Sequence, residues 1–192
     1  GRGRSLMVFS SLTFLFIFLP LVLLFYFLLP GIRAKNAVLC LFSLVFYAWG
    51  EPVYVLLMIA SILLNYLVGL GMARFPGRKK GLLVLALIFN LGAIGYFKYA
   101  GFFLSSLNSL FSLHLPALQI ALPIGISFYT FQILSYVIDV YHGRTAAQKN
   151  LLSLATYITM FPQLVAGPIV RYETVREELS ARHVSLNDFT EG

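Results

Sequence analysis

The sequence predicts an all-α, polytopic transmembrane helical protein with about five or six membrane segments, some of them broken or re-entrant. Of its 192 residues, 59% are hydrophobic and only 11% are charged, whereas a typical soluble domain carries about 25% charged residues. The mean hydropathy is +0.87. A helix needs roughly 20 apolar residues to cross the hydrocarbon core of a bilayer. This composition excludes a soluble globular fold and makes the lipid bilayer the natural surroundings of the chain.

The net charge of +7 does not indicate a nucleic-acid partner. The 14 lysine and arginine residues lie in short clusters between apolar runs, whereas nucleic-acid-binding proteins gather them on one face. Short basic clusters are typical of the loops that set membrane topology. The single cysteine, Cys40, lies inside an apolar run, so we expect a small packing residue. The sequence predicts no metal site and no intrachain disulfide.

The first apolar run, 6–29, is predicted to span the membrane, and Pro30-Gly31 closes it. It is longer than the core of a secretory signal, and no small-residue cleavage site follows it. From Met7 onward the sequence reads like a natural start. Residues 1–6 are therefore expected to be an upstream addition.

The second and third apolar runs, 37–49 and 53–73, are predicted to form a tight helical hairpin around the turn at 50–52. A short basic link with Arg33 and Lys35 precedes this hairpin. The hairpin gives the chain its second and third predicted crossings.

The segment 74–80 is the clearest cytoplasmic loop, because it holds four cations in seven residues. This assignment places Arg33 and Lys35 on the cytoplasmic side as well. It places Glu51 and the amino terminus outside. The sequence thus predicts a multi-pass protein of the inner membrane with loop 74–80 in the cytoplasm.

The fourth run, 81–104, is predicted to cross the membrane, with Lys98 and its aromatic neighbours at the outer interface. Residues 105–116 read as a polar connection. The next apolar run, 120–141, is interrupted by Pro123, Gly125 and several polar residues. Polar groups at membrane depth are costly unless they face protein or water, so this run is predicted to line an interior.

The sixth apolar run, 151–170, contains Pro162 and Pro168, which break a continuous helix. We therefore expect a broken or re-entrant element. Residues 172–192 are charged and are predicted to form an interfacial helix of roughly two to four turns that leads to a missing continuation. Residues 7–171 then form the amino-terminal part of one membrane domain.

Asp139 is the most notable titratable residue, because it ends an apolar run. An intramembrane carboxylate is a functional candidate by default. The alternative is that Asp139 lies at the cytoplasmic interface and pairs with a tyrosine or with Arg144. Asn65 and Ser61 are expected to link helices by hydrogen bonds rather than to contact substrate. The histidines are expected to be solvated, because they lie in or near connections: His114, His142 and His183.

Two motifs carry a resemblance to a known family. Residues 122–132 read LPIGISFYTFQ and are followed by Ser135-Tyr136 and by 139–141, while residues 161–171 read FPQLVAGPIVR. With these motifs the chain strongly resembles the membrane-bound O-acyltransferase family. Its alginate O-acetylase branch is the nearest look-alike, and the D-alanyl transfer protein of teichoic acid modification is a relative. The match extends over nearly the whole chain from Met7.

The resemblance implies a polytopic acyltransferase. Such an enzyme would pass an acetyl group from a cytoplasmic donor, acetyl-CoA or an acyl carrier, to a hydroxyl of an exported polysaccharide such as alginate, or to a periplasmic partner protein. The family's catalytic histidine lies on a later helix in a tryptophan-rich setting, and this sequence has no match to that setting. The resemblance therefore places the catalytic residue downstream of Gly192. It also implies that this chain alone lacks transfer activity.

The interrupted segments could wall a funnel in which donor and acceptor meet. The candidate lining residues are polar and lie on these segments: Ser127, Tyr129, Gln132, Asp139, Gln163 and Arg171. Arg171 is the candidate to lie near the anionic groups of the donor. The alternative is that these side chains only satisfy backbone groups freed by the prolines at 123, 162 and 168.

Two other functions stay open on the residues alone. Transporters and channels also build sites from broken helices, so the chain could be a subunit of one. A non-catalytic membrane scaffold is the other alternative. The two motifs favour the acyltransferase.

Overall fold

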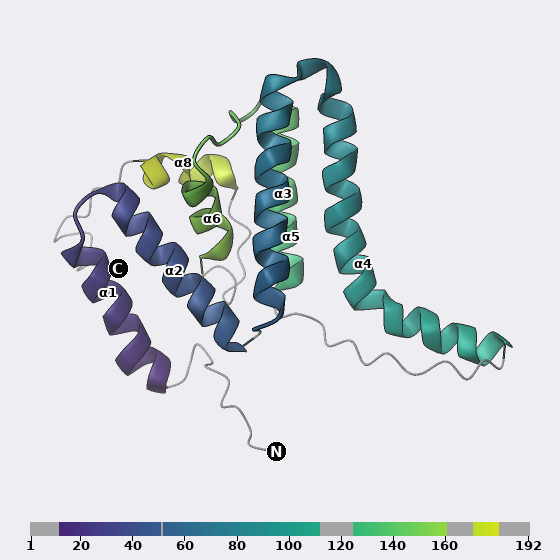
Figure 1. Cartoon of the computed structure of the whole chain (residues 1–192), viewed down its shortest axis with the longest axis horizontal. Helices are drawn as coiled ribbons and strands as arrows, with labels where there is room; N and C mark the ends of the chain where they lie inside the picture. Colours follow the sequence, from purple (N-terminus) through teal and green to yellow (C-terminus); the bar gives the residue numbers. More distant parts are fainter. Residues whose placement is uncertain (1–11, 51, 112–124, 161–170, 181–192) are drawn as a thin grey trace.

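The computed structural model describes residues 12–50, 52–111, 125–160 and 171–180. All regular elements in these ranges are helices (Figure 1). Three of them are long and apolar enough to cross a membrane, namely Ile32–Gly50, Tyr54–Arg74 and the run Pro76–Leu110. The all-α, polytopic fold predicted from composition is confirmed.

The first helix starts with a π-helical stretch, η1 (Phe14–Phe18), and continues as α1 (Leu19–Leu28). The change from one to the other comes at Pro20, which has no backbone N–H to donate to the preceding turn. Phe14 and Phe18 are buried against α2 (Ile32–Gly50), with the Phe18 and Phe42 rings in edge contact at 5.7 Å. The predicted start of this run, residues 6–11, lies outside the described residues.

The helix α2 begins at Ile32, so the predicted basic link before residue 37 is wrong. Gly31 makes the turn alone, with φ of +85°, a backbone region that favours glycine. Arg33 and Lys35 then occupy the first turn of α2. Their long side chains allow this, because they can keep the charged groups in water beyond the end of an apolar helix. The Lys35 ammonium lies 5.0 Å from the centre of the Tyr26 ring.

Two asparagines join α3 (Tyr54–Arg74) to α4 (Lys79–Phe111). The Asn65 amide donates to Asn90 Oδ1 at 3.2 Å, and the Asn90 amide donates to Asn65 Oδ1 at 2.9 Å. Each amide also donates to the carbonyl four residues earlier on its own helix, at 2.7 Å in both cases. Both side chains are buried, and Asn65 links helices as predicted.

The helix α4 is longer than predicted. It runs for 33 residues to Phe111, so the expected polar connection is helical over 105–111, and 112–116 lie outside the described residues. Ser105 and Ser109 donate to carbonyls of their own helix, at 2.8 and 3.0 Å, which lets a serine-rich stretch stay helical. A rise of about 1.5 Å per residue gives a length of roughly 50 Å. The last part of α4 bends away from the bundle (Figure 1).

The remaining helices are α5 (Ile126–Tyr141), α6 (Leu151–Thr159) and α8 (Tyr172–Ser180). Asn150 caps the start of α6 by accepting from the Leu152 amide at 3.0 Å. The helix α6 ends at Thr159, ahead of Pro162, so the break predicted in 151–170 begins there. With 9 residues, α8 has the predicted length of two to four turns.

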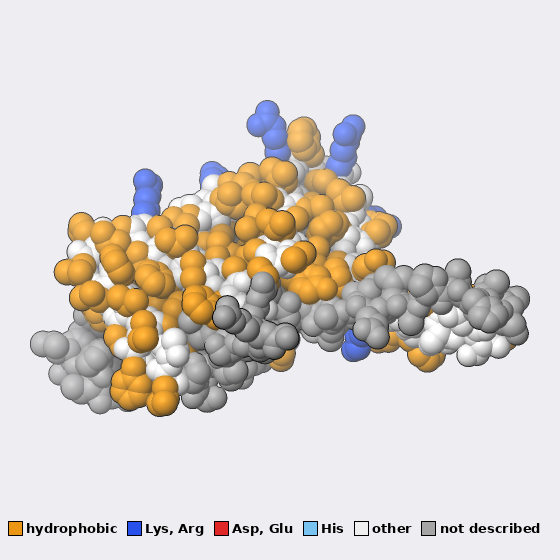
Figure 2. Space-filling view, turned by 60° about the horizontal axis from the view of Figure 1, so that its bottom comes forward, with side chains coloured by type: hydrophobic (Ala, Val, Ile, Leu, Met, Phe, Trp, Pro, Cys, Tyr) orange, Lys and Arg blue, Asp and Glu red, His pale blue; other side chains and the backbone are white. Residues whose placement is uncertain are grey.

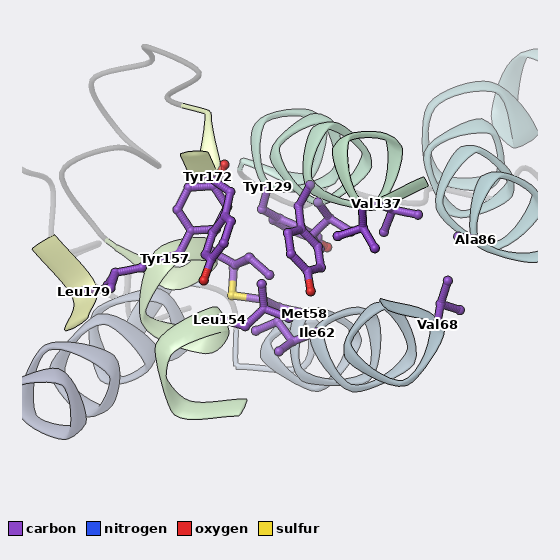
Figure 3. Close-up of a cluster of buried hydrophobic side chains, with 14 of the residues drawn as sticks. Met58, Ile62, Val68, Ala86, Tyr129, Val137, Leu154, Tyr157, Tyr172 and Leu179 are labelled. Atoms are coloured by element: carbon purple, nitrogen blue, oxygen red, sulfur yellow. The ribbon is translucent and has the colours of Figure 1, made fainter. Parts of the chain in front are cut away.

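The main core lies where α3, α5, α6 and α8 meet. It contains large buried side chains from each of these helices, including Met58, Tyr129, Leu154, Tyr157 and Tyr172 (Figure 3). The helix α8 contributes Tyr172 and Leu179, so this charged segment packs against the bundle on one face. Its exposed face carries Arg176 and Glu177.

The turns at 29–33, 74–80 and 142–150 all lie at one end of the bundle (Figure 1). We call this end the basic side. Lysine and arginine side chains stand along one edge of the space-filling view (Figure 2). The tertiary contacts agree, because the Tyr66 hydroxyl, in the second half of α3, donates to the Lys149 carbonyl at 2.7 Å. The chain therefore concentrates positive charge at one end of its apolar helices.

Replacing Asn65 with leucine should lower the free energy of unfolding by about 1–2 kcal/mol, because Asn90 then loses its buried partner. The double variant Asn65→Leu/Asn90→Leu should cost less than the sum of the two single changes. Leu63→Ala, at a position 43% exposed on the same helix, is the control and should have a small effect. Thermal unfolding in detergent is measured for the unsubstituted chain, the two single variants Asn65→Leu and Asn90→Leu, the double variant and the control. Strictly additive losses of stability in the double variant would contradict the paired geometry.

Candidate functional site

Four buried polar residues of α5 recur on one face of the helix. Tyr129, Gln132, Tyr136 and Asp139 follow one another at spacings of three or four residues, and each is at most 4% exposed. Phe128 and Phe131 of the same helix are exposed. As predicted, this run faces the interior of the described bundle. We call the four residues the α5 polar face.

The α5 polar face is set by where the helix starts. Gly125 precedes the first turn with φ of +75°, a conformation that a residue with a Cβ adopts only with strain. The Tyr129 amide donates to the Gly125 carbonyl at 3.0 Å, which closes the first turn. The glycine of the motif therefore sets where α5 begins, and with it the side of the helix on which Tyr129 and Gln132 face the bundle.

Gln132 joins α5 to the end of α6. Its amide donates to the Tyr157 carbonyl at 2.9 Å. Because α6 ends at Thr159, this carbonyl is one of the last four of the helix, which lack partners within it. For Gln132 the structure supports the alternative that the side chain satisfies backbone freed near Pro162.

Three tyrosines and one glutamine tie α5, α6 and α8 together. The Tyr172 ring makes edge contacts with Tyr136 and Tyr157, at 5.1 and 5.2 Å between centroids. The Gln148 amide nitrogen of the backbone donates to the Tyr136 hydroxyl at 2.9 Å, and its side-chain amide donates to the Tyr172 hydroxyl. Burial raises the pKa of Tyr172, so its hydroxyl is neutral.

The Tyr129 hydroxyl differs from these three. Its ring is in edge contact with Tyr47 at 6.4 Å. The hydroxyl is buried and has no hydrogen-bond partner among the described residues. An unpartnered buried hydroxyl is uncommon in a folded protein. Asp139 Oδ2 on the same face is also buried without a hydrogen-bond partner among the described residues, but Asp139 is held by Arg144 through its other oxygen. Tyr129 is therefore the residue of the α5 polar face whose polar group is left to meet another molecule or another part of the chain.

Asp139 lies at the basic side and forms an ion pair with Arg144, with Oδ1 and Nη1 3.6 Å apart. The Asp139 carbonyl also accepts the Arg144 amide at 2.9 Å, in a turn made possible by Gly143 with φ of +73°. The Asp139 side chain is 5% exposed and that of Arg144 is 57% exposed. The structure shows the predicted pair of Asp139 with Arg144.

The other predicted lining residues do not gather on the α5 polar face. Ser127 is half-buried and lies about 200° around α5 from Tyr129. Arg171 is exposed, one residue before α8. Gln163 lies outside the described residues. Of the histidines, His142 is exposed at the end of α5, and the other two also lie outside the described residues.

Sequence reasoning missed two of the residues that organise this region. Asn36 is buried on α2 and donates to the Leu179 carbonyl of α8 at 2.9 Å. The charged segment from Tyr172 onward predicts an interfacial helix and gives no core role to Tyr172, yet this residue is 1% exposed. The signal was present, because Tyr172, Val175 and Leu179 recur with helical spacing on one face.

Cys40 is a packing residue, as predicted. It is buried on α2, and the Thr159 hydroxyl of α6 lies 3.9 Å from its sulfur. Among the described residues, no group of three or more metal-ligating side chains comes together.

These helices define a polytopic membrane protein with a polar face inside its bundle, and comparison with known proteins gives the family. The chain is 42% identical over 97% of its length to a Pseudomonas aeruginosa protein named "Probable alginate O-acetylase AlgI". It is 41% identical over 97% of its length to the protein of that name from Azotobacter vinelandii. It is 33% identical over 92% of its length to the "Peptidoglycan O-acetyltransferase" of Helicobacter pylori.

The chain belongs to the family of the alginate O-acetylases, which confirms the resemblance stated from its motifs. It spans 37% of the Pseudomonas aeruginosa protein and 39% of the Helicobacter pylori protein. No family model matches the chain, and no solved structure matches it significantly.

Replacing Gly69 with alanine should loosen the contact between α3 and α5. A Cβ at this position would lie 2.9 Å from the Tyr136 hydroxyl, which must then shift away from the Gln148 amide. We expect a loss of about 1–3 kcal/mol in the free energy of unfolding. Gly92→Ala is the matched control, because its Cβ would meet nothing within 4 Å. Thermal unfolding in detergent measures both, and equal stability of the two variants would contradict the contact.

Proposed function

We propose that this chain forms part of a membrane-bound O-acyltransferase that transfers acetyl groups from a cytoplasmic donor to hydroxyls of an exported polysaccharide. The observation that carries the proposal is 42% identity over 97% of the chain to a protein named as an alginate O-acetylase. Alginate is favoured as the acceptor over peptidoglycan, because identity to the peptidoglycan O-acetyltransferase is lower, at 33%. A periplasmic partner protein that carries the acetyl group onward is the other acceptor.

The chemistry needs groups in defined roles. Acyl transfer to a hydroxyl requires a base that takes its proton and donors that hold the developing oxyanion. We propose that the base is the histidine implied by the family resemblance, in the part of the relatives' length that this chain does not span. This chain would supply a wall of the acyl path. The donor would be acetyl-CoA or an acyl carrier.

The α5 polar face is the part of this wall that the described residues support best. Gln132, Tyr136 and Asp139 are committed to contacts with the protein. The Tyr129 hydroxyl is buried and has no hydrogen-bond partner among the described residues, so it is available to donate to a substrate carbonyl or hydroxyl. We therefore assign substrate contact to Tyr129 and positioning to the other three.

The proposal is tested in a chimera. The chain replaces the 193 aligned residues of the Pseudomonas aeruginosa protein, and alginate acetylation is measured in cells that lack the native enzyme. We expect the chimera to acetylate alginate. Tyr129→Phe should reduce acetylation by about tenfold or more. The protein level and the thermal stability should stay the same, because the substitution removes a hydroxyl that has no hydrogen-bond partner among the described residues.

Tyr99→Phe is the matched control, since this tyrosine is 48% exposed on α4. It should acetylate like the unsubstituted chimera. A well-expressed chimera that acetylates no polysaccharide would overturn the proposed function. An active chimera that tolerates Tyr129→Phe would keep the function and remove Tyr129 from the acyl path.

We also propose that the protein lies in the inner membrane with its basic side in the cytoplasm and its amino terminus outside. The support is that the basic turns at 29–33, 74–80 and 142–150 share one end of the bundle (Figure 1). The rule that basic loops face the cytoplasm applies to all three at once. A donor from the cytoplasm would then approach the end of α5 that carries Asp139.

Single cysteines test this orientation in a Cys40→Ser background. Val53, 71% exposed at the end of the bundle opposite the basic side, and Arg78, exposed in the basic loop, are each replaced by cysteine. A membrane-impermeant maleimide added to spheroplasts should label Val53→Cys at once. Arg78→Cys should react only after the membrane is permeabilised. The reverse pattern would overturn the orientation.

A further inference from the structure

A pocket of about 480 Å³ opens on the basic side between the start of α2 and the start of α6. Its lining residues come from both helices and from the turn before α6: Arg33, Gln148, Lys149, Asn150, Leu151 and Leu152. Ligand pockets usually have volumes of about 300–1,000 Å³. None of these six residues belongs to the α5 polar face or to the two family motifs.

The turn that forms one wall of this pocket is held from three helices. The Lys149 carbonyl accepts from the Tyr66 hydroxyl of α3 at 2.7 Å. The Gln148 backbone amide donates to Tyr136 of α5 at 2.9 Å, and its side chain donates to Tyr172 of α8. The Gln148 side-chain oxygen also accepts the Asn150 amide at 3.0 Å. This wall of the pocket is therefore held in place before any ligand binds, which lowers the entropic cost of binding.

The pocket is cationic. Arg33 and Lys149 contribute two positive charges, and no acidic residue lines it. Among the described residues the one salt bridge joins Arg144 to Asp139, so neither Arg33 nor Lys149 has an acidic partner there. A guanidinium and an ammonium that share a pocket favour a phosphate, which can accept hydrogen bonds from both.

The surroundings indicate a phosphate that belongs to a lipid. Arg33 lies in the first turn of a helix long and apolar enough to span the membrane, which places it at the level of the headgroups. Leu151 and Leu152 add an apolar wall of half-buried side chains beside the charges. Basic pockets between transmembrane helices on the cytoplasmic side are known to suit anionic headgroups.

We propose that this pocket binds the headgroup phosphate of an anionic phospholipid, phosphatidylglycerol or cardiolipin, through Arg33 and Lys149. The bound lipid clamps the start of α2 to the turn before α6 on the basic side. The proposal is independent of the acyl transfer, because it requires only the pocket and the bilayer.

Native mass spectrometry of the full chain released from detergent micelles tests the proposal with phosphatidylglycerol and phosphatidylcholine as probes. The unsubstituted chain should retain one phosphatidylglycerol in preference to phosphatidylcholine. The double variant Arg33→Gln/Lys149→Gln should bind phosphatidylglycerol about tenfold more weakly, which corresponds to about 1.4 kcal/mol. Arg33→Lys keeps the charge and should retain most of the binding.

The matched control is Arg78→Gln/Lys80→Gln, which removes two charges from the same side of the bundle outside the pocket. It should bind phosphatidylglycerol like the unsubstituted chain. Equal weakening by both double variants would overturn the proposal, because attraction would then come from net charge alone. Binding of soluble coenzyme A that depends on Arg33 and Lys149, with no retained phosphatidylglycerol, would also overturn it and assign the pocket to a soluble phosphate. Circular dichroism of each variant confirms that helical content is unchanged.

Discussion

Hydrocarbon offers no hydrogen bonds, so a polar group inside the bundle is costly unless it finds a partner in the protein. This constraint explains how the helices are joined. Asn65 and Asn90 exchange two hydrogen bonds and direct their remaining donors to their own helices. Thr156 donates to the Asn36 carbonyl of α2 at 3.0 Å. Because lipid is as apolar as leucine, such contacts give helix pairs a specificity that apolar packing alone does not provide.

The same constraint explains why the functional region is built around α5. A helix that breaks at depth leaves carbonyls without partners, and Gln132 meets one of them at the end of α6. A polar face that stabilises broken helices can also bind a substrate. Groups that already bond within the protein stabilise the helices, and groups that have no partner can contact the substrate. On α5 the Tyr129 hydroxyl and Asp139 Oδ2 have no hydrogen-bond partner among the described residues, and Asp139 is already held by Arg144 through its other oxygen. The family motif thus combines positioning residues with one residue that is free to act.

Composition and charge were enough to predict the helices of the described bundle, because lipid imposes length and apolarity on every span. They also placed the basic turns on one side. Helix ends were predicted less well, since Arg33 and Lys35 read as a link while Gly31 allows α2 to start before them. The serine-rich end of α4 misled in the same way, because Ser105 and Ser109 satisfy their hydroxyls within the helix.

The site was predicted in part. The cost of polar groups in lipid was enough to place the run that carries Tyr129, Gln132 and Asp139 at a protein interior. The partner of Gln132, Tyr157, and the partners of Tyr136, Gln148 and Tyr172, could not be predicted, because they belong to later parts of the chain that only the packing of α6 and α8 brings close. The pairing of Asp139 was predictable as one of two alternatives, since Arg144 follows it within a helix-ending turn.

The docking of α8 has a consequence for the motif between α6 and α8. The residues on either side of this motif are held by the bundle. Thr159 contacts Cys40 before it, and Tyr172 packs into the core after it. Closing the twelve-residue segment between Thr159 and Tyr172 costs roughly 2 kcal/mol in chain entropy relative to free ends, apart from a constant. Anchoring also couples the motif to α8 thermodynamically. A ligand that binds the motif more tightly when α8 is docked must strengthen that docking by the same factor, so substrate binding and the seating of a surface helix become reciprocal events.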